Sequence, residues 1–126
     1  MIVRHGIDMV EVDRIQNSIE KGGKSFLKRV FTSGEQAYCE PKRMKYEHYA
    51  ARFAAKEAVT KVLKSKKYLQ IAYSDIEICR KATGKPFVKI SQRALAKLKL
   101  PSRYQLEISL SHERKLAIAA CVLVIP

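Results

Sequence analysis

Residues 44–65 read MKYEHYAARFAAKEAVTKVLKS, a segment that is rich in Ala, Glu and Lys and contains neither Gly nor Pro. Ala, Glu and Lys are strong helix formers, whereas Gly and Pro interrupt helices. The segment therefore predicts the longest helix of the protein, running from about Met44 to about Ser65.

Two charged side chains interrupt the apolar face of this predicted helix. At about 100° per residue, Glu57 and Lys61 fall on the same face as Phe53 and Ala54. Burying an unpaired carboxylate is costly, so Glu57 needs a partner. An ordinary ion pair with Lys61 one turn later, worth about 0.3–0.5 kcal/mol, would supply one, and a bound metal ion is the alternative.

The chain before the long helix predicts one strand and three shorter helices. Residues 2–12 are rich in Val and Ile and predict a strand, after which Asp13 is a good N-cap for a helix that Gly22–Gly23 ends. A second helix can start at Ser25. Thr32 with Glu35, or Ser33 with Gln36, offers a capping box for the third helix.

The chain after the long helix predicts short strands. Residues 74–79 and 87–90 predict a hairpin around the turn at residues 82–86, and a short helix ends before Pro101. Residues 105–111 then alternate apolar and polar side chains, as a half-buried strand does. The predicted fold class is α+β, with one long helix and short helices packed on an antiparallel sheet.

The last predicted strand is apolar on both of its faces. Residues 116–125 read LAIAACVLVI. This is unusual in an antiparallel sheet that has one wet face. We expect either helices or other subunits to cover the second face.

The composition indicates one globular domain spanning residues 1–126, with 47% hydrophobic residues. No apolar run is long enough to cross a bilayer, and no secretory cleavage site follows the N-terminus. We therefore expect a soluble cytoplasmic protein with no membrane partner. The three cysteines show no metal-binding spacing and predict free thiols.

The net charge is +13, from 25 Lys and Arg against 12 Asp and Glu. Such a surface attracts anions, so nucleic acid, an anionic cofactor or an acidic protein would each suit it. A basic surface that serves solubility alone is also consistent with this charge.

Asp8 is a second carboxylate in apolar surroundings, within Ile7-Asp8-Met9-Val10. Strand interiors disfavour Asp unless its oxygens are satisfied, although a position at the strand end would satisfy them through a turn. Asp8 and Glu57 could instead share a hard cation, since Mg²⁺ takes one or two carboxylates and completes its shell with water and phosphate oxygens. Lys61 would then neutralise a phosphate oxygen.

Several segments together resemble the holo-[acyl carrier protein] synthase family of the 4′-phosphopantetheinyl transferases. In chain order they are Gly6-Ile-Asp-Met-Val-Glu11 with Arg14, Arg52-Phe-Ala-Ala-Lys-Glu-Ala-Val-Thr-Lys61, Asp75-Ile-Glu-Ile78 with Gly84-Lys-Pro86, and Ser109-Leu-Ser-His112. The resemblance covers nearly the whole chain, and the segment ending at Lys61 combined with the upstream Gly-x-Asp is the most specific part.

The resemblance implies transfer of 4′-phosphopantetheine from coenzyme A to a serine of the apo carrier protein, which releases adenosine 3′,5′-bisphosphate. Asp8 and Glu57 match the Mg²⁺-binding acids, and Lys61 matches the basic residue near the transferred phosphate. The positions that match the region receiving the nucleotide portion of coenzyme A are Arg52, Gly84, Lys85, Pro86, Ser111 and His112.

The resemblance also implies partners. Arg14 matches a contact to the acidic helix of the acyl carrier protein. Small members of the family are trimers with active sites between subunits, which would explain a strand that is apolar on both faces. Three features depart from the family pattern: Tyr73 stands where tryptophan is common, Glu113 stands where a hydroxyl residue is common, and the usual Gly-rich turn after Lys61 is missing.

A nucleic-acid-binding module is the alternative function. It would use the basic surface and treat residues 84–88 as a degraded RNA-recognition strand, which ordinarily carries two or three exposed aromatic residues. Phe87 is the only aromatic residue in that segment. A pair of carboxylates on apolar faces also suits a phosphate-binding surface poorly, so we expect no nucleic-acid partner.

Overall fold

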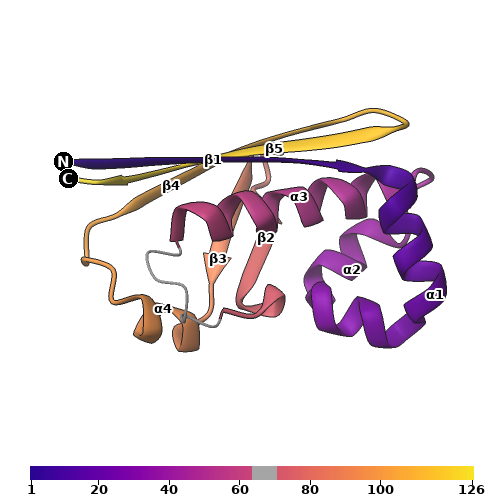
Figure 1. Ribbon diagram of the computed structural model, residues 1–126, viewed down its shortest axis with the longest axis horizontal. Helices are drawn as coiled ribbons and strands as arrows, with labels where there is room; N and C mark the ends of the chain where they lie inside the picture. The colour runs from indigo at the N-terminus through magenta and orange to yellow at the C-terminus, as the bar shows by residue number, and fades with distance from the viewer. Residues whose placement is uncertain (64–70) are drawn as a thin grey trace.

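The computed structural model describes residues 1–63 and 71–126 and has an α+β fold. In chain order its elements are β1 (Ile2–Glu11), α1 (Val12–Val30), α2 (Ser33–Cys39), α3 (Lys45–Leu63), the 3₁₀ helix η1 (Tyr73–Asp75), β2 (Ile76–Arg80), β3 (Pro86–Ile90), α4 (Gln92–Leu98), β4 (Gln105–His112) and β5 (Leu116–Ile125). Figure 1 shows the sheet of β1, β4 and β5 as a layer along one side of α3. The predicted fold class is confirmed.

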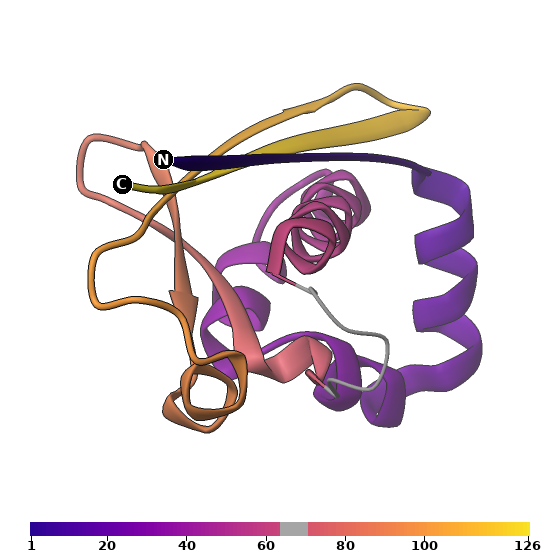
Figure 2. The ribbon, with the colours of Figure 1, turned by 60° about the vertical axis from the view of Figure 1, so that its left-hand side comes forward.

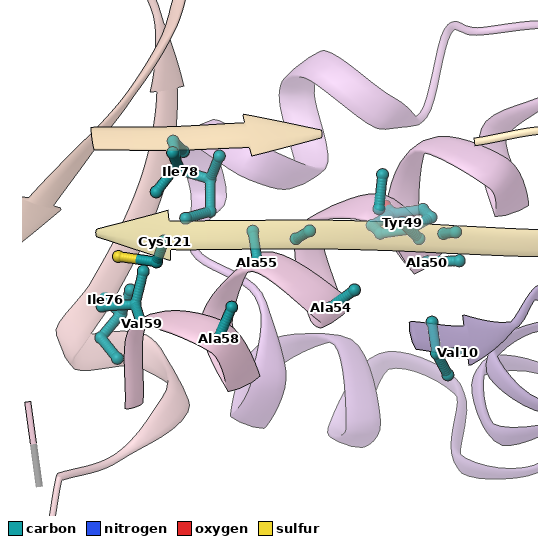
Figure 3. Close-up of a cluster of buried hydrophobic side chains, with 14 of the residues drawn as sticks. Val10, Tyr49, Ala50, Ala54, Ala55, Ala58, Val59, Ile76, Ile78 and Cys121 are labelled. Atoms are coloured by element: carbon teal, nitrogen blue, oxygen red, sulfur yellow. The ribbon is translucent and has the colours of Figure 1, made fainter. Parts of the chain in front are cut away.

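Helix α3 is the centre of the molecule. Figure 2 looks nearly along its axis, with the sheet on one side of it and α1 and the β2–β3 hairpin flanking it. The sheet has the order β1-β5-β4 and is antiparallel throughout, so β5 is the central strand. Its inward residues, such as Ala119 and Cys121, are buried in one core with the small side chains of α3, including Ala54 and Ala58. Figure 3 shows Cys121 and these two alanines.

Gly6 allows β1 to cross α3 at close range. A Cβ atom at this position would lie 2.5 Å from the backbone oxygen of Ala58 and 3.1 Å from Val62 Cγ1. Since a backbone oxygen cannot swing aside, any larger residue would push the strand away from the helix. The glycine therefore brings Asp8, two residues further along the inward side of β1, up to the side chains of α3.

The outward face of the sheet is apolar and open in a single chain. Met9, Ile7 and Val3 on β1 are 62%, 49% and 58% exposed, and Leu116 and Ile118 on β5 are 39% and 37% exposed. Within residues 1–63 and 71–126, no helix lies over this face (Figure 1). We expected helices or other subunits to cover the two faces of the final strand, β5. Helix α3 covers its inward face, and its outward face is free to contact another chain.

The observed helix ends differ from the prediction in local detail. Strand β1 ends at Glu11, which takes the N-cap position of α1, so Asp13 lies in the first turn and not at the cap. Its carboxylate there still complements the helix dipole. The two helices expected on either side of Gly22–Gly23 are both present, and α1 comprises them together, with a kink at Gly23, whose φ of 57° and ψ of −143° are not helical. The predicted end of the long helix, residues 64–65, lies outside the described residues.

The capping box of α2 is confirmed, with both reciprocal hydrogen bonds between Thr32 and Glu35. Glu35 also makes an ion pair in the core that sequence did not predict. Lys56 Nζ lies 2.7 Å from Glu35 Oε1, and neither side chain is exposed to solvent. The same ammonium group donates to the backbone oxygens of Tyr73 and Ile76, at 2.8 and 2.6 Å. This ion pair therefore joins α2, α3, η1 and β2.

None of the described helices combines the length and the apolar composition needed to cross a bilayer.

Candidate active site

A cavity of about 450 Å³ opens between β1, α1, α3 and η1. Asp8, Arg14 and Glu57 all line it, although Glu57 lies far from the other two in the sequence. Its other walls include the aromatic rings of Phe26, Phe53 and Tyr73 and the cation of Arg29. The structure thus brings together the two carboxylates that sequence singled out, and it places basic and aromatic side chains around them.

Asp8 reaches this cavity because of the register of its strand. It is paired with Ala119 of β5 and lies on the inward side of β1, which continues to Glu11. Asp8 is therefore a residue of the strand interior, so the alternative placement at a strand end is wrong. Its Oδ1 lies 3.3 Å from Lys61 Nζ, and the same ammonium group donates to the backbone oxygen of Ile7 at 2.7 Å.

Glu57 has a different partner from the one that helical spacing suggested. Its Oε1 accepts a hydrogen bond of 2.6 Å from the hydroxyl of Tyr73. Lys61, one turn along the helix, pairs with Asp8. The ordinary ion pair between Glu57 and Lys61 is therefore absent from the described contacts. Burial, together with the hydrogen bond to Glu57, raises the pKa of Tyr73 to about 12, so its hydroxyl keeps its proton at neutral pH.

The donor atoms in this cavity suit Mg²⁺. Asp8 and Glu57 supply carboxylate oxygens to one cavity, which has room for water and a ligand beside them. The described residues contain no cluster of three or more His, Cys, Asp or Glu side chains, the arrangement that a fully protein-bound metal such as zinc needs. Mg²⁺ needs only one or two carboxylates, with phosphate and water oxygens as the remaining ligands.

A second group of residues, which includes the predicted Arg52, gathers around the ring of Tyr38. The cations of Arg52, Lys42 and Arg80 lie 3.9, 4.6 and 5.3 Å from its centroid. We call these four residues the Tyr38 cluster. Arg52 is only 1% exposed, and its Nε has no partner in the described part of the chain, although one Nη1 hydrogen donates to the backbone oxygen of His48. A buried guanidinium with an unused donor is suited to an anionic ligand.

His112 and Gly84 both reach the edge of the Tyr38 cluster. The ring of His48 packs against Tyr38 and against His112, with centroids 5.7 and 5.0 Å apart. His112 Nδ1 lies 3.0 Å from Glu47 Oε1. The backbone oxygen of Gly84 accepts a hydrogen bond of 2.7 Å from Arg80 Nη1. Three of the residues predicted for the nucleotide end of coenzyme A are thus linked through two aromatic rings and one arginine.

No described contact joins the Tyr38 cluster to the side chains of the other three residues predicted for the nucleotide end of coenzyme A, which are Lys85, Pro86 and Ser111. Lys85 makes an exposed ion pair with Glu107 at 3.2 Å, and Pro86 begins β3. Ser111 is paired with Ile118 of β5 on the outward side of the sheet, next to His112, which faces inward. Because side chains alternate along a strand, Ser111 and His112 cannot face the same side of the sheet.

The carboxylate of Glu113 has no described contact with the cavity residues or with the Tyr38 cluster. Its Oε1 accepts hydrogen bonds from the backbone amides of Lys115 and Leu116, at 2.8 and 2.7 Å. This carboxylate therefore shapes the tight turn between β4 and β5. Tyr38, Tyr73, Lys42 and Arg80 are among the residues that the sequence did not assign to the site, and their placement by the fold reveals them.

The sequence of the chain matches a known family over most of its length. The family model for the 4′-phosphopantetheinyl transferase superfamily matches residues 4–121, which include every candidate residue named above. A holo-[acyl-carrier-protein] synthase of Ruminiclostridium cellulolyticum is 44% identical over 119 residues, which is 94% of this chain and 89% of that protein. One from Trichlorobacter lovleyi is 37% identical over the full length of both chains.

Solved structures show the same fold. The holo-[acyl-carrier-protein] synthase of Helicobacter pylori in complex with coenzyme A superposes with a TM-score of 0.81 and 27% identity, covering 96% of this chain and 100% of that one. A complex of the synthase with coenzyme A from Chronobacterium ammoniagenes gives a TM-score of 0.86 and 26% identity, covering 98% of this chain and 97% of the other.

Proposed function

The chain belongs to the 4′-phosphopantetheinyl transferase superfamily, and we propose that it is a holo-[acyl-carrier-protein] synthase. Its reaction moves 4′-phosphopantetheine from coenzyme A to a serine of the apo acyl carrier protein and releases adenosine 3′,5′-bisphosphate. The names of its relatives over nearly the whole chain support this function. The observation that carries it is the cavity in which Asp8 and Glu57 meet beside Lys61.

In the transfer, the serine oxygen forms a bond to the phosphorus that carries pantetheine, and the pyrophosphate bond breaks. The hydroxyl proton needs an acceptor, and Asp8 and Glu57 are the carboxylates that line the cavity. Lys61, whose side chain is 53% exposed beside Asp8, is placed to hold its charge against a phosphate oxygen. Asp8 and Glu57 would hold Mg²⁺, which when bound stabilises negative charge on the phosphates.

The Tyr38 cluster is the part of the chain best suited to the nucleotide end of coenzyme A. It gathers three cations, and in the described residues none of them forms an ion pair with a carboxylate. Burial, followed by the charges of His112 and Arg52, lowers the pKa of His48, which keeps that ring neutral at pH 7. Anionic phosphates would relieve the repulsion among the cations.

Mass spectrometry tests the function directly. The protein is incubated with apo acyl carrier protein, coenzyme A and Mg²⁺, and the carrier protein is weighed afterwards. We expect a gain equal to one phosphopantetheine group. An unchanged mass after long incubation with excess enzyme would contradict the assignment. In a parallel thermal shift, coenzyme A should raise the melting temperature and RNA oligomers should not, which separates this function from nucleic-acid binding.

We further propose that the working enzyme is a homotrimer with active sites between subunits. The open apolar face of the sheet, with Met9 and Ile118 exposed, supports an assembly. Glu57 and Arg52 are five residues apart on α3, so they point about 140° away from each other around the helix. This separation suits a site to which two chains each contribute one half. Light scattering at micromolar concentration should report three chains, and an active monomer would contradict this proposal.

Arg14 is expected to serve the carrier protein. It lies in the first turn of α1 and lines the cavity beside Asp8, where an acidic helix would approach. We predict that Arg14→Glu raises the KM for the carrier protein about tenfold, or about 1.4 kcal/mol if KM follows binding, and leaves the KM for coenzyme A nearly unchanged.

Steady-state kinetics at about 50 and about 300 mM salt measures this effect, because screening should weaken the wild type more than the variant. Arg103→Glu makes the same charge change at an exposed position outside the cavity and serves as the control. If Arg14→Glu instead raises the KM for coenzyme A and leaves the KM for the carrier protein unchanged, Arg14 does not lie on the face that binds the carrier protein.

A further inference from the structure

The hydroxyl of Tyr73 is the closest described hydrogen-bond partner of the Glu57 carboxylate. It donates to Glu57 Oε1 at 2.6 Å, and both side chains line the same cavity. The ring of Tyr73 lies against Phe53, with centroids 5.6 Å apart and planes inclined by 31°. Phe53 lies one turn before Glu57 on α3. The aromatic contact therefore holds the hydroxyl over the segment of helix that carries the carboxylate.

The backbone of Tyr73 is fixed from the core. Its carbonyl oxygen accepts a hydrogen bond of 2.8 Å from Lys56 Nζ, whose charge is paired with Glu35 in a fully buried position. Lys56 and Glu57 are neighbours in the sequence and project from different sides of α3. One helix thus holds Tyr73 at two points, through the backbone by Lys56 and through the hydroxyl by Glu57.

We propose that Tyr73 is a positioning residue, whose hydroxyl fixes the orientation of the Glu57 carboxylate in the cavity and so sets its affinity for a divalent cation. This inference rests on the proposed function, because it assigns Glu57 the task of holding the ion. A free carboxylate on the flexible side chain of glutamate has several orientations, and a charge-assisted hydrogen bond selects one of them. Since that bond engages Oε1, Oε2 is the oxygen left to face the other contents of the cavity.

The test is Tyr73→Phe, which removes one oxygen and keeps the ring against Phe53. Mn²⁺ serves as the probe, and its binding is measured without substrates from the electron paramagnetic resonance signal of the free ion. We expect the dissociation constant for Mn²⁺ to rise about tenfold, as the loss of a hydrogen bond to a charged group predicts. We expect kcat at limiting Mg²⁺ to fall by a similar factor, and the KM for the carrier protein to stay unchanged.

Tyr104→Phe removes a hydroxyl outside the cavity and should change none of these quantities. Tyr73→Trp is the second variant, because indole keeps an N–H donor on a flat ring, and it should bind Mn²⁺ more tightly than Tyr73→Phe. If Tyr73→Phe binds Mn²⁺ as the wild type does, or loses only thermal stability, the positioning role is overturned while the proposed function stands. A wild type that transfers no phosphopantetheine overturns both.

Discussion

Asp8→Asn and Glu57→Gln should each lower kcat by about 10²–10³-fold, the loss typical when one preorganised charge-stabilising group is removed from an active site. Each change keeps the shape of the side chain and removes its charge. Asp8 and Glu57 lie in one cavity, where each contributes a carboxylate oxygen. With one of them neutral, the remaining charge holds a divalent cation poorly, and one possible acceptor for the serine proton is also lost.

The rates are measured with saturating carrier protein and coenzyme A over a range of Mg²⁺ concentrations, with circular dichroism to confirm folding. Glu20→Gln is the matched control, because it neutralises an exposed carboxylate of α1 that does not line the cavity. A chelator should reduce the wild type to the level of the two variants. Near-normal turnover of either variant at limiting Mg²⁺ would show that the two carboxylates do not share an ion.

The carboxylates of the site could be predicted because each breaks a local pattern. Asp8 interrupts a run of apolar strand residues, and Glu57 interrupts the apolar stripe of a helix. The partners of these residues could not be predicted in the same way. Helical spacing pairs Glu57 with Lys61, whereas the fold gives Lys61 to Asp8 and gives Glu57 to Tyr73. That exchange depends on how closely β1 crosses α3, which is a property of the packed chain.

The helices and strands likewise divide into features that local sequence sets and features that only the packed chain sets. The capping box of α2 was predictable, because it involves residues within one turn of helix. The start of β2 was placed too early, since Tyr73–Asp75 forms a 3₁₀ turn in which the Asp75 carboxylate accepts from the amide of Ala72. The family resemblance pointed to Arg52 alone among the members of the Tyr38 cluster, and the grouping itself could not be predicted from local patterns, because its members come from three different elements and a loop.

The buried ion pair leads to the largest expected effect on stability. Lys56→Met should lower the free energy of unfolding by about 3–5 kcal/mol, the usual cost of removing one partner of a buried pair. Methionine fills a similar volume, so a cavity is not the cause. The variant leaves the carboxylate of Glu35 in the core without a counter-charge. It also removes the donor from the backbone oxygens of Tyr73 and Ile76.

Urea unfolding followed by circular dichroism, at one fixed protein concentration, measures the difference. Lys45→Met is the control, since Lys45 pairs with Glu40 at the surface and its loss should cost about 0–1 kcal/mol. The double variant Lys56→Met with Glu35→Gln removes the stranded charge, and Gln can still accept from the amides of Thr32 or Ile78. It should therefore be more stable than Lys56→Met alone. A loss below about 1 kcal/mol in Lys56→Met would mean that Glu35 stays in the core without its cation at little cost, contrary to the expected penalty for an unpaired buried charge.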